Sequence, residues 1–352
     1  MDFSFSDDQI ALRGLAQRII ADASTNQRWA AAAAADGWDL ELWRTLGEAG
    51  LIAIGLPESC GGGGYTVLES SVVLEEIGRV SAPVPGFAVM ALAAPALAAA
   101  GRTDVLSGVA AGTTVVTAAI HEPTGAVGAP VTVVANGKLT GTKVCVPAGT
   151  IASHFVVDAT DGLYLVASGA DGVEVERQDT TTGMPDALVT FTDAPCERLG
   201  DTAASAHMIQ LGMIGAAIIT SGACAGALKL TADYATTRKQ FDKPIASFQA
   251  VSQRAGDAYI DAEAVRLTAW QAAWRVANGF DASEAVLTAK FWAADGGHRV
   301  LNAAQHIHGG VGVDRDYPLH RLYLLVKQLE LQLGSATPSL LSLGKILAAT
   351  PA

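Results

Sequence analysis

The sequence has little charge and few aromatic side chains. Of its 352 residues, 16% are charged and 6% are aromatic, whereas 50% are hydrophobic. A disordered chain combines low hydrophobicity with a high density of charge, so disorder is excluded. Lysine and arginine number 23 against 35 aspartates and glutamates, and the resulting net charge of −12 argues against a nucleic-acid-binding protein. A chain of this length is expected to form two or three domains with a sizeable core.

Cysteine is also scarce. Cys60, Cys145, Cys196 and Cys224 lie far apart, and none has the CxxC or Cys/His spacing of a zinc site. We interpret them as reduced, mostly buried thiols of a cytoplasmic protein, so neither a disulfide nor a metal site is expected. The first eight residues lack the basic and apolar regions of a secretory signal, so no such signal is expected.

One uncharged run is long enough to cross a membrane. Residues 211–228 contain 18 residues without a charge, and Gly222 and Gly226 form a GxxxG pair. Such a pair can be a dimerisation face of a membrane helix. The run is rich in glycine, alanine, serine and threonine, and small residues also permit close approach inside a helical bundle. We favour the buried helix and expect no membrane association.

The first third of the chain has the pattern of helices. Ser6 or Asp7 is placed to cap a helix that carries apolar residues at positions 10, 12, 15 and 19. Two further helices are expected over residues 40–50 and 68–79, the second of them stopped by prolines.

From about residue 113 to 199 the chain becomes rich in valine and threonine. The dipeptides Asn136-Gly137, Asp161-Gly162 and Asp171-Gly172 separate short β-like runs and predict hairpin turns. The expected strands cover residues 131–134, 142–146, 154–157, 163–166, 173–175 and 188–191. This composition predicts a compact β domain.

Beyond about residue 203 the pattern is helical again. Long segments at 208–238, 248–279, 283–306 and 319–333 suit a four-helix bundle. We therefore predict an α+β protein in three parts. These are an N-terminal helical domain (1–112), a middle antiparallel β domain (113–200) and a C-terminal four-helix bundle (201–352).

Five motifs follow one another along this order. They are GLIAIGLPE at 50–58 with Gly61-Gly62, LEEIGR at 74–79, YATTRKQFDKPI at 234–245 with Phe248-Gln249, HGGVG at 308–312, and Tyr317-Pro318. Their order and spacing resemble the acyl-CoA dehydrogenase family over nearly the whole chain. The predicted three-part fold is the one that this resemblance implies.

The resemblance implies FAD as cofactor, a CoA thioester as substrate, and α,β-dehydrogenation. In that reaction a glutamate removes the α-proton while the β-hydrogen leaves as hydride to flavin N5. The carboxylate must be desolvated and oriented, and the flavin supplies the redox chemistry. An electron-transferring flavoprotein is the acceptor expected from the family.

The usual catalytic base is missing from its place. The family's glutamate lies in an EGT motif, and counting from Tyr317-Pro318 puts that position at Leu333. Some members place the base on the first long bundle helix, where the matching residue is Gly212, beside Met213 in place of an arginine. The nearest carboxylate is Glu330, about one helical turn before Leu333. A relocated base at Glu330 is possible, and we favour a solvated surface glutamate.

The segments that hold the flavin ring in the family are altered as well. Residues 121–128 read HEPTGAVG in place of TEPGAGSD, so Glu122-Pro123 remains, while the hydroxyl before it and the Ser-Asp after it are gone. In the segment matching WITNG, the threonine that meets flavin N5 is Pro147, which has neither a hydroxyl nor an N–H. The tryptophan beside the ring is Cys145. The resemblance thus implies that this chain's own ring site is dismantled.

The residues that grip the FAD dinucleotide tail across a subunit interface are largely retained. The matching positions are Arg238, Gln240, Phe241, Phe248 and Gln249, together with His306, His308, Gly309 and Gly310. His306 stands where glutamine is usual, with Gln305 adjacent. Arg238 would serve as a charge-assisted fork for phosphate, although an arginine also forms ordinary surface ion pairs and glycines cap helices. We favour the cofactor interpretation because these residues remain while the ring site does not.

Together these features favour the non-catalytic subunit of a heterotetrameric (α2β2) acyl-CoA dehydrogenase. Residues 312–318 and 327–331 look like the subgroup that acts on steroid side-chain CoA thioesters. The chain would complete the FAD site of a paralogous subunit that carries the base. One alternative is a self-sufficient homotetrameric enzyme with a relocated base, and another is a non-redox binding or scaffold protein on the same fold.

Overall fold

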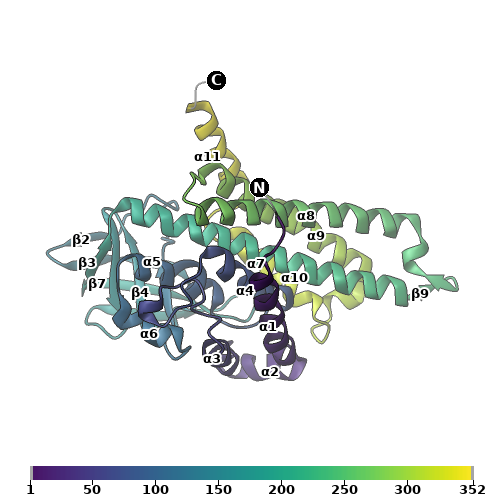
Figure 1. Cartoon of the computed structure of the whole chain (residues 1–352), viewed down its shortest axis with the longest axis horizontal. Coiled ribbons are helices and arrows are strands. Elements are labelled where there is room, and N and C mark those ends of the chain that lie inside the picture. The colour runs from purple at the N-terminus through teal and green to yellow at the C-terminus, as the bar shows by residue number, and fades with distance from the viewer. Residues whose placement is uncertain (1–2, 350–352) are drawn as a thin grey trace. The chain divides into compact units, whose positions relative to one another are not determined.

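The structure is a computed structural model that describes residues 3–349 (Figure 1). It divides into two compact units. We call Met1–Asn26, Leu74–Ala82 and Ala216–Ala352 the helical unit, and Gln27–Val73 with Pro83–Gly215 the mixed unit. Each unit is described by itself below.

Long helices form the helical unit. Helix α1 (Asp7–Ala23) begins with a capping box in which Ser6 and Gln9 exchange hydrogen bonds, so the cap is Ser6 and not Asp7. The other helices of this unit are the last part of α4 (Val67–Val80), most of α7 (Thr202–Thr237), α8 (Gln249–Ala277), α9 (Ser283–His308), α10 (Leu319–Leu331) and α11 (Ala336–Ala349). Helix α11 packs on α9. It was not predicted, because the last helix expected from the sequence ended at residue 333.

The GxxxG pair lies where α7 crosses α4. A Cβ atom at Gly222 would be 1.9 Å from the Glu75 carbonyl oxygen, and one at Gly226 would be 2.1 Å from the Arg79 carbonyl oxygen. Among the described residues, α7 is the one helix long and apolar enough to cross a bilayer, but 72% of its most apolar window is buried inside the fold. The small residues therefore serve the close packing of a core helix, as predicted.

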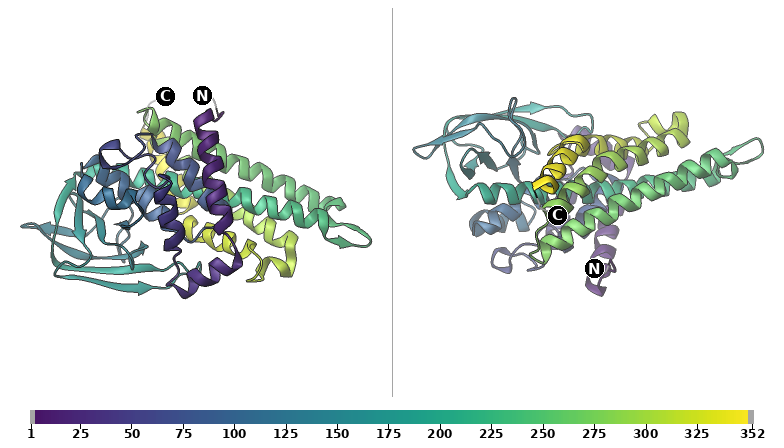
Figure 2. Two further views of the ribbon diagram at one scale, coloured as in Figure 1. Left: turned by 60° about the horizontal axis from the view of Figure 1, so that its bottom comes forward. Right: turned by 90° about the horizontal axis from the view of Figure 1, so that it is seen from above.

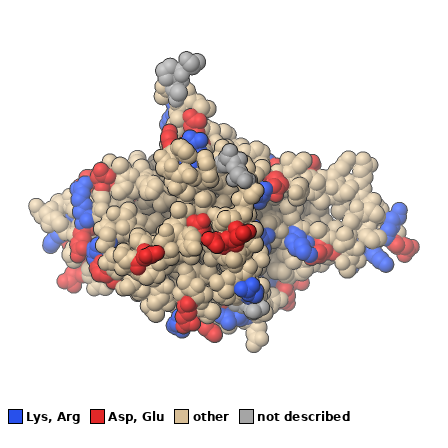
Figure 3. Space-filling view, viewed as in Figure 1, with Lys and Arg blue, Asp and Glu red and all other residues tan. Residues whose placement is uncertain are grey.

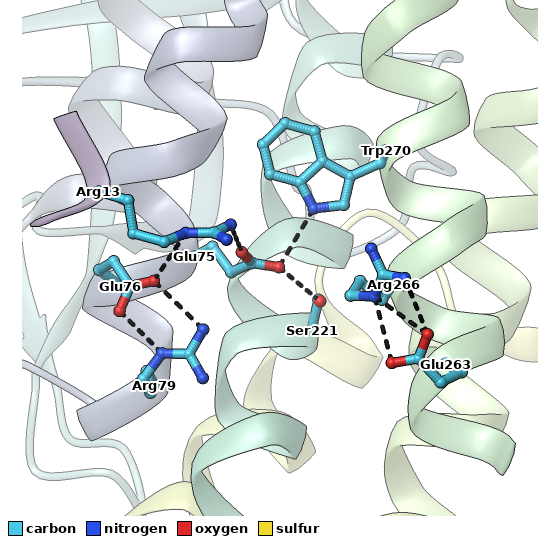
Figure 4. Close-up of polar contacts among 8 residues, drawn as sticks. All are labelled: Arg13, Glu75, Glu76, Arg79, Ser221, Glu263, Arg266 and Trp270. Atoms are coloured by element: carbon cyan, nitrogen blue, oxygen red, sulfur yellow. Dashed lines mark hydrogen bonds and ion pairs between the residues drawn. The ribbon is translucent and has the colours of Figure 1, made fainter. Parts of the chain in front are cut away.

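A buried carboxylate fixes this crossing. Glu75 accepts hydrogen bonds from Arg13 Nη2 at 2.6 Å, from Ser221 Oγ at 2.8 Å and from Trp270 Nε1 at 3.2 Å (Figure 4). These partners come from α1, α7 and α8, so one side chain of α4 connects three other helices. Because the charge is fully hydrogen-bonded, its burial does not leave an unpaired ion.

The mixed unit combines short helices with two four-stranded sheets. Its helices are α2 (Asn26–Ala34), α3 (Leu40–Glu48), a 3-10 helix (Glu58–Cys60), a π-helical segment (Phe87–Ala93), α5 (Ala94–Ala99) and α6 (Thr103–Ala110), together with the first parts of α4 and α7. One sheet has the order β1 (Val116–Ala119), β4 (His154–Ala159), β5 (Gly162–Ala167), β8 (Glu197–Gly200). The other has the order β2 (Val133–Ala135), β3 (Lys138–Pro147), β7 (Asp186–Pro195), β6 (Val173–Gln178). Phe155 and Phe191 meet edge to face at 6.1 Å in the core of the β region.

The predicted order of helices, strands and helices is confirmed, with two local differences. The turn at Asp171-Gly172 is not a hairpin, since β5 and β6 belong to different sheets. Strands β1 and β4 pair in parallel, so the β region is not purely antiparallel. The predicted hairpin at Asn136-Gly137 is present, and both residues have the positive φ of a type I′ turn.

The cysteines follow their prediction in part. All four thiols are free, with Cys60 and Cys224 buried, Cys196 intermediate and Cys145 exposed, so the expectation of mostly buried thiols holds for two of the four. No metal-binding group of His, Cys, Asp or Glu occurs among the described residues. On the face drawn in Figure 3, lysine and arginine are interspersed with acidic residues and form no continuous basic patch.

Candidate cofactor-binding site

Helices α7 and α8 are joined by a short hairpin at the end of the helical unit (Figure 2). Strands β9 (Lys239–Gln240) and β10 (Lys243–Pro244) pair antiparallel. The turn residues Phe241 and Asp242 both have positive φ, at 51° and 63°, as a two-residue type I′ turn requires. This geometry presents Arg238, directly after α7, at the base of the hairpin.

The polar side chains at this end have few partners of their own. Arg238 and Gln249 are exposed, and neither side chain forms a hydrogen bond or ion pair within residues 3–349. Arg238 thus lacks the surface ion pair that was the alternative to phosphate binding. Phe241 is 86% exposed and meets Phe248 edge to face at 6.2 Å, while the Gln240 amide donates to the Lys239 carbonyl at 2.8 Å.

A glycine turn follows the end of α9. Gly309 has φ 60° and ψ −134°, a backbone conformation that favours glycine, and both Gly309 and Gly310 are exposed. A Cβ atom built on either glycine would have nothing within 4 Å, so no neighbouring atom of the chain requires glycine at Gly310. Beside the turn, Gln305 Oε1 is buried without a partner among the described residues, and His306 is exposed.

His308 does not face the open side of this turn. It is 2% exposed, and its ring stacks on Tyr234 with 4.5 Å between centroids. Nδ1 lies 2.8 Å from the Ala304 carbonyl oxygen, and Nε2 lies 3.1 Å from the Tyr317 hydroxyl. Burial lowers the pKa of His308, which favours the neutral ring. The motif alone did not reveal this inward orientation.

The two positions of the family's base carry no carboxylate and are buried. Leu333 is 2% exposed and has φ 57°, and Gly212 lies within α7. The side chain of Glu330 is only 17% exposed, with Oε2 3.1 Å from His298 Nδ1 and Oε1 3.0 Å from Lys327 Nζ. Glu330 is therefore a partly buried, ion-paired residue and not the solvated surface glutamate that we expected.

A second lysine holds the turn before Leu333. Lys290 is fully buried, and its Nζ donates to the carbonyl oxygens of Leu329 at 2.9 Å and Glu330 at 3.0 Å. These are among the last carbonyls of α10, which have no partner within the helix. Burial lowers the pKa of Lys290 to about 7.

In the mixed unit, Glu122 of the Glu122-Pro123 pair belongs to an internal network. Glu122 is buried and accepts from Lys143 Nζ at 2.7 Å, from Thr132 Oγ1 at 2.5 Å and from the Val131 N–H at 2.6 Å. Burial alone would raise the pKa of Glu122, but the bonds from Lys143 and Thr132 outweigh it and hold the pKa below its ordinary value. This carboxylate is charged and fully occupied by its own chain.

The two other ring-segment positions lie on β3. Cys145 is exposed with φ 50°, and its N–H donates to Gln178 Oε1 at 2.7 Å. The Pro147 carbonyl accepts from Thr117 Oγ1 at 2.5 Å. Lys143, between the two altered segments, was missed, because a single lysine in a strand pattern gives no sign that it is buried.

Family models and solved structures match this architecture. Residues 6–113 match the model described as "Acyl-CoA dehydrogenase, N-terminal domain", and residues 202–342 match "Acyl-CoA dehydrogenase, C-terminal domain". The chain belongs to the acyl-CoA dehydrogenase family. As a member of this family, the chain is placed among oxidoreductases.

Close relatives of this acyl-CoA dehydrogenase are known. Acyl-CoA dehydrogenase FadE27 of Mycobacterium tuberculosis is 41% identical over 338 residues, covering 90% of each chain. A chain of the ChsE4-ChsE5 complex from Mycobacterium tuberculosis superposes with a TM-score of 0.94 at 38% identity, covering 100% of both chains. A variant of the Tcur3481-Tcur3483 steroid ACAD superposes with a TM-score of 0.93 at 38% identity, covering 97% of this chain and 98% of that one.

The cofactor of this family is FAD, and only one of the two groups of residues fits it. In the helical unit, Arg238 offers an unpaired guanidinium at the α7–α8 hairpin, and at the end of α9 the glycine turn offers backbone without a side chain and Gln305 has an unpaired amide oxygen. In the mixed unit, Pro147 has no N–H to donate and Glu122 is already occupied.

Proposed function

We propose that this chain is the non-catalytic subunit of a heterotetrameric, FAD-dependent acyl-CoA dehydrogenase, and that it completes the FAD site of a paralogous subunit. One contrast carries the proposal. Arg238 and Gln249 have no partner among the described residues, whereas Leu333 and Gly212 offer no carboxylate where the family keeps its base. Groups suited to hold a dinucleotide are present, and the group that would remove a proton is not.

The relatives support the same assembly. Two of the structures that superpose over nearly the whole chain are described as pairs of different proteins, the ChsE4-ChsE5 complex and the Tcur3481-Tcur3483 steroid ACAD. We infer from this likeness a paralogous partner and a steroid side-chain CoA thioester as substrate. A cytoplasmic location, an electron-transferring flavoprotein as acceptor, and the three-domain division at residues 112 and 200 belong to the same proposal.

Each retained residue has a definite task in this proposal. The Arg238 guanidinium pairs with a phosphate of the dinucleotide, and its planar fork suits two parallel hydrogen bonds. Gly309 and Gly310 let that part of the cofactor approach the backbone closely, and Gln249 donates or accepts beside it. We assign Gln240, Phe241, Phe248 and His306 to the same site, where Gln240, Phe241 and His306 are exposed and Phe248 is half-buried. When bound, FAD accepts the hydride that leaves the substrate β-carbon.

The test compares the chain alone with the chain co-purified with a paralogue that has an intact base motif and ring segment. We expect flavin absorbance and dehydrogenase activity in the complex and neither in the isolated chain. Arg238→Ala should then lower FAD occupancy of the complex about tenfold or more, since a charged hydrogen-bonding group is lost. Arg44→Ala, which removes an exposed arginine elsewhere, is the matched control. Full FAD occupancy and turnover by the isolated chain would contradict the proposal.

A self-sufficient enzyme is the second candidate, and one observation favours it. Glu330 is largely buried beside His298, three positions before Leu333, so a desolvated carboxylate does exist near the family's base position in the chain. In that case, purified homo-oligomer should turn over and Glu330→Gln should abolish turnover. Unchanged activity of the Gln variant rejects Glu330 as the base.

A further inference from the structure

Three family motifs meet at one buried ring in the helical unit. His308 opens the HGGVG motif at the end of α9, Tyr234 opens the YATTR motif near the end of α7, and Tyr317 precedes Pro318 before α10. His308 is stacked on Tyr234 at 4.5 Å and lies 5.2 Å from the Tyr317 ring, centroid to centroid. Residues far apart in sequence are thus joined through one imidazole.

The hydrogen bonds of His308 define which ring nitrogen carries the proton. The Ala304 carbonyl can only accept, so Nδ1, 2.8 Å away, must be the donor. Burial favours the neutral ring and outweighs the Ala304 and Leu230 carbonyls, which act in the opposite direction, so Nε2 is an acceptor and the Tyr317 hydroxyl at 3.1 Å donates to it. Both nitrogens are therefore occupied inside the protein, and neither is left for a ligand.

This arrangement adjoins the proposed dinucleotide site along the chain at two points. Arg238 follows Tyr234 by one helical turn, and its N–H donates to the Tyr234 carbonyl at 2.8 Å. Gly309 follows His308 immediately in the chain. Fixing the two rings against each other fixes the end of α7 relative to the end of α9, and with them the guanidinium and the glycine turn.

We propose that His308 is a positioning residue that clamps the phosphate-binding end of α7 to the glycine turn of α9, and that it does not itself contact the cofactor. This inference rests on the proposed function, because it assigns His308 a role in the same FAD-tail site. It replaces the direct contact expected for His308 from the motif. The titratable side chains that contact the ring are Tyr234 from α7 and Tyr317 from the segment before α10, and Asp233 acts on Tyr317.

The test measures binding of ADP to the full-length chain by calorimetry, and of FAD to the co-purified complex by flavin fluorescence. Tyr317→Phe removes only the hydroxyl that donates to His308, and we expect it to weaken both ligands about three- to tenfold. Tyr323→Phe is the matched control, since it removes a hydroxyl that bonds Asn302 on the exposed surface. It should leave both affinities unchanged.

Two His308 variants separate positioning from general stability. The side-chain oxygen of glutamine can accept from Tyr317, so His308→Gln should retain more affinity than the apolar His308→Leu. Nitrogen-15 spectra of the histidine rings provide a readout that is independent of any ligand. They should show the Nδ1–H form of His308 in the wild-type chain and a changed signal in Tyr317→Phe.

The outcomes distinguish this inference from the proposed function. If Arg238→Ala weakens binding while Tyr317→Phe and His308→Leu bind as tightly as the wild type, the clamp is refuted and the FAD-tail site stands. An Nε2–H signal for His308 refutes it as well. If Arg238→Ala also binds normally, the proposed FAD-tail site fails, and the inference that rests on it fails with it.

Discussion

The Glu122 carboxylate is buried and hydrogen-bonded within this chain, whereas the Arg238 guanidinium is exposed and unpaired among the described residues. Glu122 lies in a buried network in which Lys143, Thr132 and a backbone N–H satisfy its oxygens. Arg238, at the α7–α8 hairpin, is exposed and has no side-chain partner within residues 3–349. Both segments resemble cofactor-contacting motifs of one family.

The difference indicates which motif stabilises the fold here and which is available to bind a ligand. A buried ion must be paired within the protein, so the Glu122 network contributes to folding and has little left for a ligand. An exposed guanidinium costs little to leave unpaired and can give its full set of donors to a phosphate. Loss of a side chain should therefore reduce stability in the first region and binding in the second.

Lys143→Met should have the largest effect on stability. It leaves the Glu122 carboxylate buried without its cation, and we expect the free energy of unfolding to fall by about 3–5 kcal/mol. Urea denaturation followed by circular dichroism measures this. The exposed Lys345→Met is the control, expected within about 0.5 kcal/mol of the wild type. If Glu122→Gln in the Lys143→Met background restores no stability, the pair is not the cause.

Gly222 and Gly256 give a similar contrast, between a closely packed and an open position of the backbone. At Gly222 a Cβ atom would lie 1.9 Å from the Glu75 carbonyl oxygen, so Gly222→Ala must push α7 away from α4. We expect a loss of about 1–3 kcal/mol in the free energy of unfolding. Gly256→Ala on α8, where a Cβ atom has nothing within 4 Å, is the control and should be neutral or stabilising. Equal stability of both variants would contradict the close packing.

The buried Lys290 should make the free energy of unfolding depend on pH. Burial lowers its pKa to about 7, so between pH 7 and pH 10 the unfolded chain binds more protons at this lysine than the folded chain. The free energy of unfolding of the wild type, relative to Lys290→Met, should therefore rise with pH over this window, by at most about 1.4 kcal/mol per pH unit. Parallel pH profiles of the two proteins in thermal denaturation would show that Lys290 does not titrate there.

Gly310→Ala should have the smallest effect on stability. Nothing lies within 4 Å of the added methyl group, so we expect the free energy of unfolding to change by less than about 0.5 kcal/mol. FAD occupancy of the complex should nevertheless fall, since the methyl group enters the space proposed for the dinucleotide. A Gly310→Ala complex with normal FAD occupancy would remove the glycine turn from the site.

The sequence predicted more of the architecture than of the contacts. The capped first helix, the Asn136-Gly137 hairpin and the long bundle helices followed from local patterns, and the structure confirms them. The partners of Glu122 could not be predicted in this way, since Glu122 lies in the segment after β1 and Lys143 lies on β3, and only the folded chain brings the two together. The inward orientation of His308 was missed for the same reason. A motif gives the order of its residues, but it does not show whether a given side chain faces the protein interior or solvent.

The turn at Leu333 has a consequence for protein engineering. Leu333 has φ 57° and the following Gly334 has φ 96°, a backbone path that costs a leucine roughly 1 kcal/mol or more. The Lys290 ammonium supports this path by donating to the Leu329 and Glu330 carbonyls just before the turn, and the Leu333 side chain is itself buried. Any residue placed at position 333 must therefore tolerate both burial and a left-handed backbone. Glycine and asparagine meet the backbone requirement more easily than a β-branched residue does.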